Sequence, residues 1–560
     1  MGTIVNPENI NSFIKLVKGN DKSLFVDKTD FIKETNERIN QDINLLAFTR
    51  PRRFGKTITA HMLSAYYSKG YAGQHIFDGL KITGNDYRAS FEKHLNKYDV
   101  IYIDMNSVNA KYRAYIRDDD KVKGVHSLLD YLEYDVISEL KEDPRFTECL
   151  SRNKITNIGV FRALTALHKD LNTQFIFIMD EWDLIYREFR DDTQLQEDFI
   201  NMLRDLFKSD DGQACFALAY LTGILPIKKY NSQSALNNFD EYNMLTPGEY
   251  TSYFGFTEGE VDEIVSSRSC KVSRNQLKSW YEGYKINNVD IYNPNSVCKA
   301  VMRNECISYW SGTSSNEEVV RLINLNFKGI KSDIIKLIEG AEVPFTCINF
   351  QNDMVSIEDK DDVFSLLVCL GFLGCSNSAG EYNKKAYVPN TELRLTLMKI
   401  VRSQNWYKRM QTIKRSEKLL KAILKLDGNT VATIIQEIHN SKAVSLLTYN
   451  NEESLTYCIM TGLLWSTLDD YTCHREEQSG KGRVDVVYQP YSMEHPLILI
   501  EFKYDTSAEE ALSQIKSREY FKGYMAEYLD IIMVGINYST QTKEHQCVIE
   551  KFNINGNASI

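Results

Sequence analysis

A loop with the residue types of a phosphate-binding site follows an apolar stretch near the amino terminus. Residues 44–57 read NLLAFTRPRRFGKT and end in Gly55, Lys56 and Thr57. A glycine lets the backbone approach a phosphate, a lysine reaches the β- and γ-oxygens, and a threonine hydroxyl can hold Mg2+ at the start of the next helix. The loop pattern G-x-x-x-x-G-K-[ST] expects glycine at position 50, where this chain has Arg50. A basic turn that caps a helix therefore stays open as an alternative.

An acidic pair closes a second apolar stretch. Residues 174–183 read QFIFIMDEWD, a run long enough for a buried parallel strand that ends in Asp180 and Glu181. Open α/β sheets bind ligands at the carboxyl ends of such strands, although an edge strand before an acidic turn would look similar. We expect Asp180 to hold Mg2+ and Glu181 to position or activate water. The predicted ATP site combines Asp180 with five loop residues, Arg53, Phe54, Gly55, Lys56 and Thr57.

Two carboxylates and a lysine form a second group near the carboxyl terminus. Asp485 lies in the stretch GRVDVVYQ, and Glu501 and Lys503 follow PLILI as Glu-x-Lys. Because strand side chains alternate, Glu501 and Lys503 point to the same face. Two carboxylates can hold Mg2+ or Mn2+ that activates water, while the lysine stabilises or orients the nucleophile. The group predicts metal-dependent phosphodiester cleavage, with Gln514 on the next helix orienting the phosphate or the lysine.

A lone Glu-x-Lys is common, and a surface strand with an ion pair is the usual explanation for it. In this chain the charges follow a buried apolar run, where they are costly unless they are paired or bound to metal. This context favours a functional site.

Length and composition place these motifs in a large globular chain. The 560 residues are 43% hydrophobic and 25% charged, which predicts two to four domains. The apolar runs are too short to span a bilayer and no signal region opens the chain, so we expect a cytoplasmic protein without a membrane partner. The eleven cysteines lack zinc-site spacing.

One stretch is strongly basic although the net charge is −10. Between residues 399 and 426 the only acid is Glu417, and the basic residues are Lys399, Arg402, Lys408, Arg409, Lys414, Arg415, Lys418, Lys421 and Lys425. The solvated face of a long helix is the favoured interpretation. A surface that contacts phosphates, with Trp406 and Tyr407 for stacking, is the alternative.

The elements that must position these residues fall into four regions. Strand-like runs alternate with helical ones over 1–260, which predicts a parallel sheet with helices on both faces. Residues 261–345 are expected to form a helical lid and residues 346–430 a helix-and-hairpin connecting module that is winged-helix-like. Residues 431–560 show the order helix, strand, strand, helix, strand, which holds the second group of acidic residues.

The motifs of the whole chain resemble the bacterial proteins that join an AAA-ATPase-like domain to a carboxyl-terminal PD-(D/E)XK nuclease superfamily domain. The segments that carry the resemblance include VDKTDFI, RPRRFGKT, IMDEWD, FGFTEGEV, YNPNSV, GRVDVV and LIEFKY. In this family the loop begins Arg-Pro-Arg-Arg, which accounts for Arg50. The resemblance implies a P-loop NTPase sheet and an α/β nuclease fold with Asp485, Glu501 and Lys503 at its core. It also implies a carboxylate from the preceding helix, with Glu453 as the better candidate and Glu452 as the alternative.

These expectations combine into an ATP-regulated, Mg2+-dependent nuclease. DNA is the expected substrate and RNA the second choice, and by analogy of fold the protein would suit defence against foreign DNA. The sequence leaves the oligomeric state open, with a homo-oligomer as one alternative. The alternative is an ATP-dependent switch or scaffold whose tail binds nucleic acid or a protein partner without cleavage. A P-loop phosphotransferase with an inert tail ranks last because the sequence shows no acceptor motif.

Overall fold

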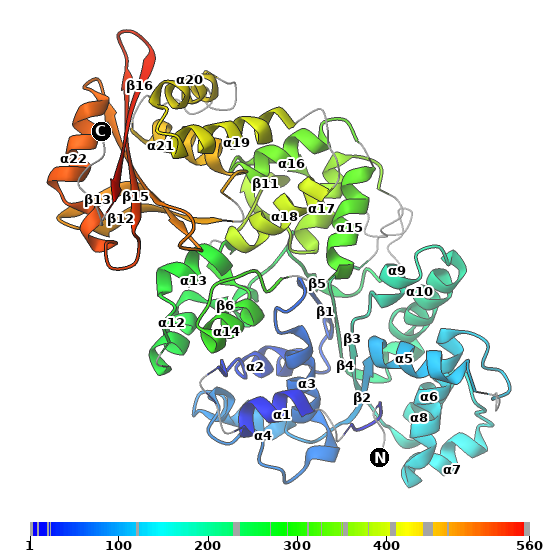
Figure 1. Ribbon diagram of the computed structural model, residues 1–560. Helices are drawn as coiled ribbons and strands as arrows, with labels where there is room; N and C mark the ends of the chain where they lie inside the picture. Colours follow the sequence, from blue (N-terminus) through cyan, green and yellow to red (C-terminus); the bar gives the residue numbers. More distant parts are fainter. Residues whose placement is uncertain are drawn as a thin grey trace. The chain divides into compact units, whose positions relative to one another are not determined.

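The chain forms two compact units, Met1–Thr396 and Leu397–Ile560 (Figure 1). The computed structural model describes residues 4–7, 11–19, 22, 24–118, 122–227, 236–268, 270–287, 289–310, 313–325, 327–348, 350, 357–378, 380–403, 410–440, 452–467 and 470–553. The finer division of the chain at residues 260, 345 and 430 stays a prediction.

A five-stranded parallel sheet organises the first unit, as the alternating pattern predicted. Its order is β2-β3-β4-β1-β5, and every described pair is parallel. The strands are β1 (Leu45–Thr49), β2 (Asp99–Asp104), β3 (Phe175–Asp180), β4 (Phe216–Gly223) and β5 (Asp240–Tyr242). The four longer strands are almost wholly buried, as expected for a sheet covered on both faces.

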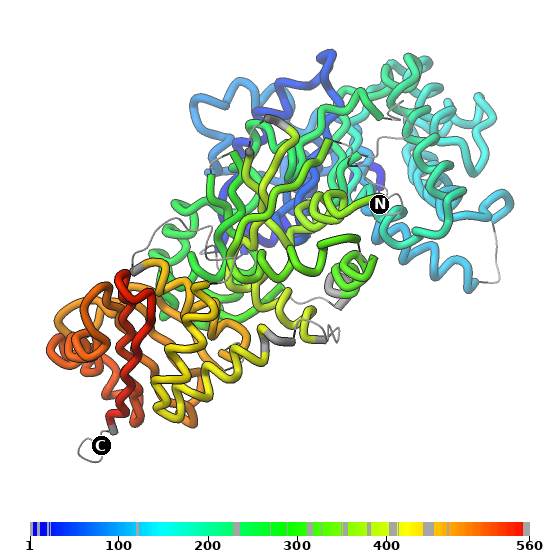
Figure 2. The backbone as a smooth tube through the Cα atoms, turned by 90° about the horizontal axis from the view of Figure 1, so that it is seen from above, coloured from blue at the N-terminus to red at the C-terminus, as the bar shows by residue number. Residues whose placement is uncertain are grey.

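Helices cover both faces of this sheet (Figures 1 and 2). One face packs against α1 (Asn11–Lys18), α2 (Phe31–Asn36), α3 (Lys56–Tyr67) and α4 (Arg88–His94), which share a core with the strands. The other side carries α5 (Met105–Tyr115), α6 (Leu128–Glu142), α7 (Pro144–Arg152), α8 (Val160–Leu171), α9 (Leu184–Glu188), α10 (Thr193–Lys208) and α11 (Asp210–Gln213). Because the strands are parallel, their carboxyl ends lie at the same edge of the sheet, which is where ligands bind in such folds.

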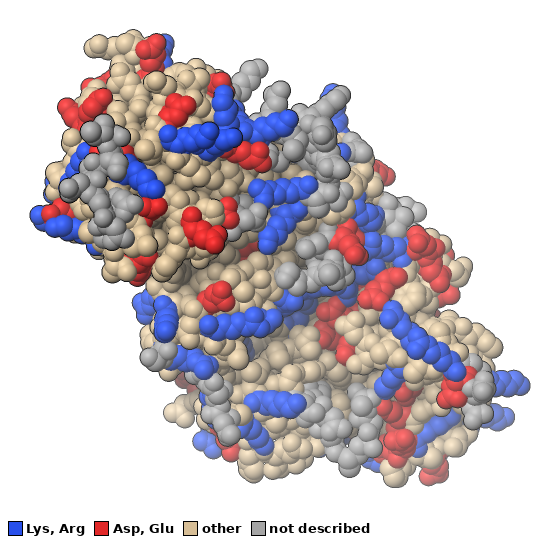
Figure 3. Space-filling model, viewed as in Figure 1, with Lys and Arg blue, Asp and Glu red and all other residues tan. Residues whose placement is uncertain are grey.

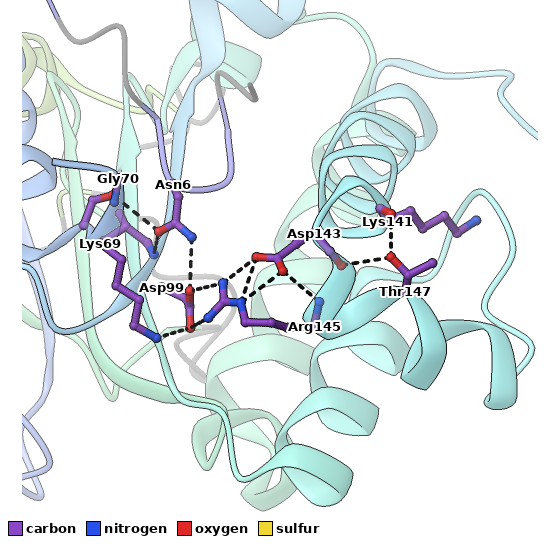
Figure 4. Close-up of polar contacts among 10 residues, drawn as sticks. Asn6, Lys69, Gly70, Asp99, Lys141, Asp143, Arg145 and Thr147 are labelled. Atoms are coloured by element: carbon purple, nitrogen blue, oxygen red, sulfur yellow. Dashed lines mark hydrogen bonds and ion pairs between the residues drawn. The ribbon is translucent and has the colours of Figure 1, made fainter. Parts of the chain in front are cut away.

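A charged network ties the opposite, amino-terminal edge of the sheet (Figure 4). Asp99 at the start of β2 is only 3% exposed and pairs with Lys69 and Arg145, each at 2.7 Å. Asn6 donates a further hydrogen bond to Asp99 at 3.1 Å. Burial alone would raise the pKa of Asp99, but the hydrogen bonds from Arg145, Lys69 and Asn6 outweigh it and hold the pKa below its usual value.

The rest of the first unit is a mixed region, where sequence periodicity predicted mainly helices. A small sheet of β6 (Phe256–Thr257), β7 (Tyr284–Ile286) and β8 (Val289–Tyr292) packs with α12 (Glu258–Ser267), α13 (Arg274–Tyr281) and α14 (Pro294–Arg303). We name Phe256–Arg303 the cap. The order α15 (Thr313–Asn324), α16 (Ile330–Ile338), β9 (Val343–Thr346), α17 (Lys360–Cys369), β10 (Gly374–Ser378) and β11 (Gly380–Tyr387) follows.

The three strands after the cap pair in the order β10-β11-β9, which resembles a winged helix. In DNA-binding proteins of the helix-turn-helix type, the recognition helix must present a face to the major groove. In α17, however, all residues from Asp362 to Cys369 are buried. This module is therefore built into the core of the unit and does not expose such a face.

The second unit is built on a mixed sheet with the order β12-β13-β14-β15-β16. Its strands are β12 (Tyr471–Ser479), β13 (Gly482–Pro490), β14 (Leu497–Tyr504), β15 (Asp530–Ser539) and β16 (Glu544–Asn553). Only β14 and β15 run parallel, and α22 (Ala508–Ser517) connects them. The predicted helix and strands are present, and the two outer strands β12 and β16 are additions that the sequence pattern did not predict.

Two layers of helices sandwich this second sheet. One face packs against α19 (Met410–Leu424), α20 (Gly428–His439) and α21 (Glu452–Leu463) through Ile498, Ile500 and Phe502. The other face packs against α22 through Leu497 and Leu499. Since side chains alternate along β14, the odd-numbered positions face α22 and the even-numbered positions face α19 to α21. Helix α18 (Thr391–Ser403) spans the division between the two units.

Charged side chains of both signs lie on the protein surface (Figure 3). Lysine and arginine are interspersed with aspartate and glutamate on the face shown in Figure 3. No helix in the described part of the chain is both long enough and apolar enough to cross a membrane.

Candidate functional site

The loop that follows β1 has the backbone of a phosphate cradle. Gly55 takes a left-handed φ of 91° at the start of α3, a conformation that favours glycine. Lys56 is buried, and its ammonium group donates a hydrogen bond to the Pro51 carbonyl oxygen at 2.9 Å. Burial lowers the pKa of Lys56, while Glu181 and Asp180 oppose that shift. The loop thus carries a lysine and a helix amino terminus at the carboxyl edge of the sheet.

Asp180 lies beside this loop at the end of β3. Its carboxylate accepts a hydrogen bond from the Thr57 side chain. Burial and the neighbouring charge of Glu181 raise the pKa of Asp180 to about 7, although Thr57 and Lys56 oppose the rise. A divalent cation shared by Asp180 and Thr57 would compensate this buried charge, so the two residues fit Mg2+.

Arg50, which replaces the expected glycine, is a structural residue. Its side chain is fully buried and donates hydrogen bonds at 2.9 Å to the carbonyl oxygens of Thr49 and Tyr242. The guanidinium also lies 5.4 Å from the centre of the Phe254 ring. Burial lowers the pKa of Arg50 to about 10. Arg50 therefore fastens the start of the loop to β5.

The next loop residues contact a distant part of the same unit. A β-carbon at Gly371 would lie 2.5 Å from Pro51, so only glycine permits this close contact. Arg53 is exposed and donates a hydrogen bond to the Tyr309 carbonyl oxygen. Phe54 is buried and packs edge to face on Tyr284. Arg50, Pro51 and Arg53 thus hold the cradle against the rest of the unit.

The Glu392 carboxylate accepts hydrogen bonds from the backbone of Tyr309 and Trp310. We name Tyr309–Trp310 the strap. The backbone amides of Tyr309 and Trp310 donate to Glu392 at 2.5 and 2.7 Å, and Ser296 donates at 2.9 Å. Glu392 is 1% exposed, and burial raises its pKa to about 7. Because Glu392 lies in the first turn of α18, the phosphate loop and α18 hold the same strap.

Glu181 is held by an arginine that the sequence motifs did not single out. Glu181 has a left-handed φ of 56°, a strained conformation for this residue type. Its carboxylate forms an ion pair with Arg187, whose Nε lies 2.9 Å from Asp183. Asp183 is fully buried and accepts the Leu225 amide at 2.9 Å. The helical spacing of DEWDLIYR, with Asp183 and Arg187 four residues apart, is the signal that could have identified the arginine.

Thr222, at the end of β4, lies between the strands that carry Asp180 and the phosphate loop. It is register partner to Asp180 and to Phe48. Its hydroxyl is buried and donates to the Phe48 carbonyl oxygen at 2.9 Å. The Thr222 hydroxyl therefore links the carboxyl ends of β4 and β1.

A cavity of about 840 Å³ lies against the loop, Glu181 and Arg187. Its polar wall includes Arg52, Arg53, Lys56, Thr57, Glu181 and Arg187. Its apolar wall includes Phe13, Leu16, Phe25, Val26, Met62 and Phe256. The cap adds Pro294, Asn295 and Cys298. A cationic end and an apolar end suit a nucleotide, with phosphates at one and a base at the other.

In the second unit the predicted catalytic residues converge on one face of the sheet. Glu501 is 2% exposed, and Lys503 Nζ lies 3.7 Å from its carboxylate. The Gln514 amide donates to the same carboxylate and to the Tyr520 hydroxyl, the latter at 3.2 Å. Asp485 accepts the Phe502 amide at 2.7 Å. The structure therefore brings Asp485, Glu501, Lys503 and Gln514 together, and their catalytic roles stay a prediction.

Backbone geometry explains this convergence. The paired register of β13 and β14 runs to Val486 opposite Ile500, and the next residue, Asp485, takes the Phe502 amide with its side chain. On the other side, a β-carbon at Gly535 would lie 2.3 Å from the Ala508 carbonyl oxygen. Glycine at this position lets α22 lie close to β15, which brings Gln514 over Glu501.

The site offers oxygen ligands of the kind that Mg2+ or Mn2+ takes. Burial, together with the charges of Glu501 and Asp485, raises the pKa of Tyr520, so both carboxylates act on this hydroxyl. A buried glutamate beside an aspartate fits a divalent ion. No cluster of three or more His, Cys, Asp or Glu side chains that could hold a metal occurs among the described residues.

Two further candidates have different outcomes. Glu453 is exposed on α21, and no described contact joins it to Asp485 or Glu501; the side chain of Glu452 lies outside the described residues. Trp406, Tyr407, Lys408 and Arg409 also lie outside them. Helix α19 exposes Lys414, Lys418 and Lys421 to solvent, which both interpretations of the basic stretch require.

Comparisons with known proteins identify families for both parts of the chain. Residues 7–231 match the family described as predicted AAA-ATPase, and residues 451–548 match the PD-(D/E)XK nuclease superfamily. An uncharacterized protein in the vnfD 5' region of Azotobacter chroococcum mcd 1 is 21% identical over 563 residues, which cover 96% of this chain and 97% of that protein.

Two solved structures show a weaker likeness. The Aeropyrum pernix ORC1 protein in complex with DNA is 11% identical at a TM-score of 0.25, over 73% of this chain and 100% of that chain. The Aeropyrum pernix ORC2 protein, in ADPNP-ADP complexes, is 13% identical at a TM-score of 0.28, over 67% of this chain and 93% of that chain. A likeness at these TM-scores adds nothing to the fold described above.

The family matches enclose the two sites. Lys56 and Asp180 fall in the first match, which supports ATP binding, and Asp485, Glu501 and Lys503 fall in the second. The cap lies beyond the first match, although it closes the cavity. The chain therefore carries an AAA-ATPase-like domain followed by a PD-(D/E)XK nuclease superfamily domain.

Proposed function

We propose that the chain binds and hydrolyses ATP in its first unit and thereby regulates a Mg2+-dependent nuclease site that cuts DNA in its second unit. The observation that carries this proposal is the convergence of Asp485, Glu501, Lys503 and Gln514 on one face of the sheet. An ATPase joined to such a nuclease would suit defence against foreign DNA.

At the nuclease site, Asp485 and Glu501 would hold Mg2+ or Mn2+, which supplies charge stabilisation and an activated water when bound. Lys503 lies at the rim of the site, 23% exposed, and would neutralise charge that develops on the phosphate. Gln514 keeps the Glu501 carboxylate in place. In the reaction, water supplies a new P–O bond and one backbone P–O bond breaks.

At the ATP site, Lys56 and the amino terminus of α3 would bind the β- and γ-phosphates. Thr57 and Asp180 would hold Mg2+, and Glu181 would accept the proton of the attacking water. The apolar wall of the cavity would cover the base.

A cleavage assay tests the proposal. Single- and double-stranded DNA and RNA are incubated with Mg2+ or Mn2+, with and without ATP. We expect wild-type protein to cut DNA in an ATP-dependent manner and Lys503→Ala to bind ATP normally but not to cut. Lys56→Ala should bind no ATP and lose the ATP dependence. If wild-type protein cuts none of these nucleic acids, it functions as a switch or scaffold instead.

A further inference from the structure

Arg187 lies between two carboxylates and the nucleotide cavity. It is 8% exposed, its Nε pairs with Asp183 at 2.9 Å, and its Nη2 pairs with Glu181. Arg187 also lines the cavity, in the company of Lys56 and Thr57. One guanidinium therefore contacts a structural carboxylate, the predicted catalytic carboxylate and the space beside the phosphate loop.

The two carboxylates differ in how firmly they are held. Asp183 is fully buried and accepts the backbone amides of Ile224 at 3.3 Å and Leu225 at 2.9 Å. Glu181 is 16% exposed, lines the cavity, and has a strained left-handed backbone. Asp183 thus fixes Arg187 at its Nε, while the contact with Glu181 can be exchanged for another anion.

We infer that Arg187 is a catalytic arginine supplied by the same chain, which leaves Glu181 for the γ-phosphate of ATP and so frees Glu181 to act on water. This inference rests on the proposed ATPase function and deepens it. In the arrangement described above, Arg187 is paired with the Glu181 carboxylate. The γ-phosphate offers a stronger, bidentate partner for the guanidinium.

The chemical step balances without a further reactant. The oxygen of water bonds to the γ-phosphorus, the bond between that phosphorus and the β–γ bridging oxygen breaks, and Glu181 takes one proton from the water. Arg187 offsets the negative charge on the γ-phosphoryl oxygens. ADP has no γ-phosphate, so in the ADP state Arg187 returns to Glu181.

Nucleotide affinity separates this role from a structural one. We expect Arg187→Ala to lower kcat for ATP hydrolysis on the order of 10³-fold. Its affinity for ADP should stay within about twofold of wild type, while its preference for a non-hydrolysable ATP analogue over ADP is lost. Because loss of Arg187 leaves Asp183 buried without its cation, Arg187→Lys is the second variant. Lysine keeps the positive charge but lacks the paired donors of the guanidinium group. The kcat of Arg187→Lys for ATP hydrolysis should therefore also fall, on the order of 100-fold.

A double-variant cycle tests the exchange itself. In Glu181→Gln, Arg187 does not have to break an ion pair before it contacts the γ-phosphate. Affinity for the ATP analogue should therefore rise about tenfold, while hydrolysis is lost. In the Arg187→Ala background, Glu181→Gln should leave affinity unchanged. The matched control is Arg190→Ala, because Arg190 pairs with Glu318 at 2.5 Å and does not line the cavity.

Two results would overturn the inference while leaving the ATPase function intact. In one, both Arg187 variants hydrolyse ATP at the wild-type rate; in the other, they weaken ATP and ADP binding equally without changing kcat. A wild-type protein that binds ATP through Lys56 but never hydrolyses it would overturn the catalytic role of Arg187 and the hydrolysis step together. Failure of nuclease activity alone would affect only the proposed function of the second unit.

Discussion

At the scale of single residues, the phosphate loop shows why a motif can depart from its pattern and keep its geometry. Arg50 takes the place of a glycine, yet its side chain points away from the cavity and bonds backbone carbonyl oxygens at the sheet edge. The conformational freedom that the loop needs is supplied five residues later by Gly55, at φ 91°. The bracing role of Arg50 therefore depends on its length and its donors.

The substitution Arg50→Gly restores the standard loop pattern but should impair the protein. The carbonyl oxygens of Thr49 and Tyr242 would lose their donors and a buried void would form. We expect the first unit to lose about 2–3 kcal/mol of stability and nucleotide affinity to fall. Thermal unfolding and titration with a labelled ATP analogue measure both effects.

An exposed arginine provides the control for this variant. Arg88 on α4 pairs with Glu92 and is 68% exposed, so Arg88→Gly should change nucleotide affinity little. If Arg50→Gly binds the ATP analogue as tightly as wild type and unfolds at the same temperature, the bracing role is wrong.

Sequence reasoning reached the residues whose chemistry is local to a motif and missed those that act across space. Asp180, Glu501 and Lys503 lie in the last part of strands that apolar runs predict, and Lys56 begins the helix that follows such a strand. The only sequence signal for Arg187 is its helical spacing from Asp183, and its contact with Glu181 depends on how α9 folds. The role of a buried arginine becomes visible only once its partners are known.

At the scale of elements, the parallel strands were predicted from continuous apolar runs, and the two runs quoted above, within residues 44–57 and 174–183, contain β1 and β3. The outer strands β12 and β16 were missed because each is rich in polar and charged residues and lies at an edge of the sheet. After α17, the strands β10 and β11 pair antiparallel within the region for which a hairpin was predicted.

The cap forms part of the predicted nucleotide cavity, and Cys298 on α14 reports on it. Burial raises the pKa of the Cys298 thiol to about 11, so its alkylation is slow at neutral pH. We expect Mg2+ with an ATP analogue at about 100 times Kd to slow this reaction on the order of 100-fold, because only the nucleotide-free fraction reacts. Alkylation followed by mass spectrometry measures the rate for each cysteine.

Cys270 is the internal control for this measurement. It lies in the same cap and bonds the Val272 carbonyl oxygen, but it does not line the cavity. Its rate should stay constant when nucleotide binds. Equal protection of both thiols would show a general tightening of the cap, and no protection of Cys298 would place the nucleotide elsewhere.

The network at the amino-terminal edge of the first sheet gives a prediction about pH. The folded pKa of Asp99 is lowered, so its contribution to stability is present above the unfolded pKa near 4 and is lost as pH falls through the folded value. Asp99→Asn should cost about 2 kcal/mol at pH 7. The difference from wild type should shrink below about pH 4.

Thermal unfolding of both proteins across this pH range provides the measurement. Asp78→Asn is the control, since Asp78 is 75% exposed and its partner is the exposed His75. A difference between Asp99→Asn and wild type that does not change with pH would mean that packing, and not charge, stabilises this edge.

At the scale of the whole molecule, α18 connects the two units covalently. Its first turn contains Glu392, which holds the strap that Arg53 of the phosphate loop also contacts. Its last residues belong to the second unit. A movement of the phosphate loop thus has a chain of direct contacts to the start of the connecting helix.

Glu392→Gln tests whether this connection transmits the state of the ATP site. The amide keeps one acceptor but loses the charge that receives both strap amides. We expect ATP hydrolysis and ATP-free nuclease activity to change less than about twofold, while the ATP dependence of cleavage is lost. Cleavage rates with and without ATP measure the coupling. Glu305→Gln is the control, because Glu305 is exposed and contacts the strap only through its backbone.

The two faces of the second sheet have a consequence for how a nucleic acid would be handled. Glu501 and Lys503 point to the α22 face, whereas the exposed lysines of α19 stand on the layer that covers the opposite face. A straight duplex seated on α19 has a full sheet and a helix layer between its phosphates and Lys503. Binding and cleavage of the nucleic acid would then occur at separate places. Neutralising the lysines of α19 would lower the binding affinity and its salt dependence. It would not change the position at which the strand is cut.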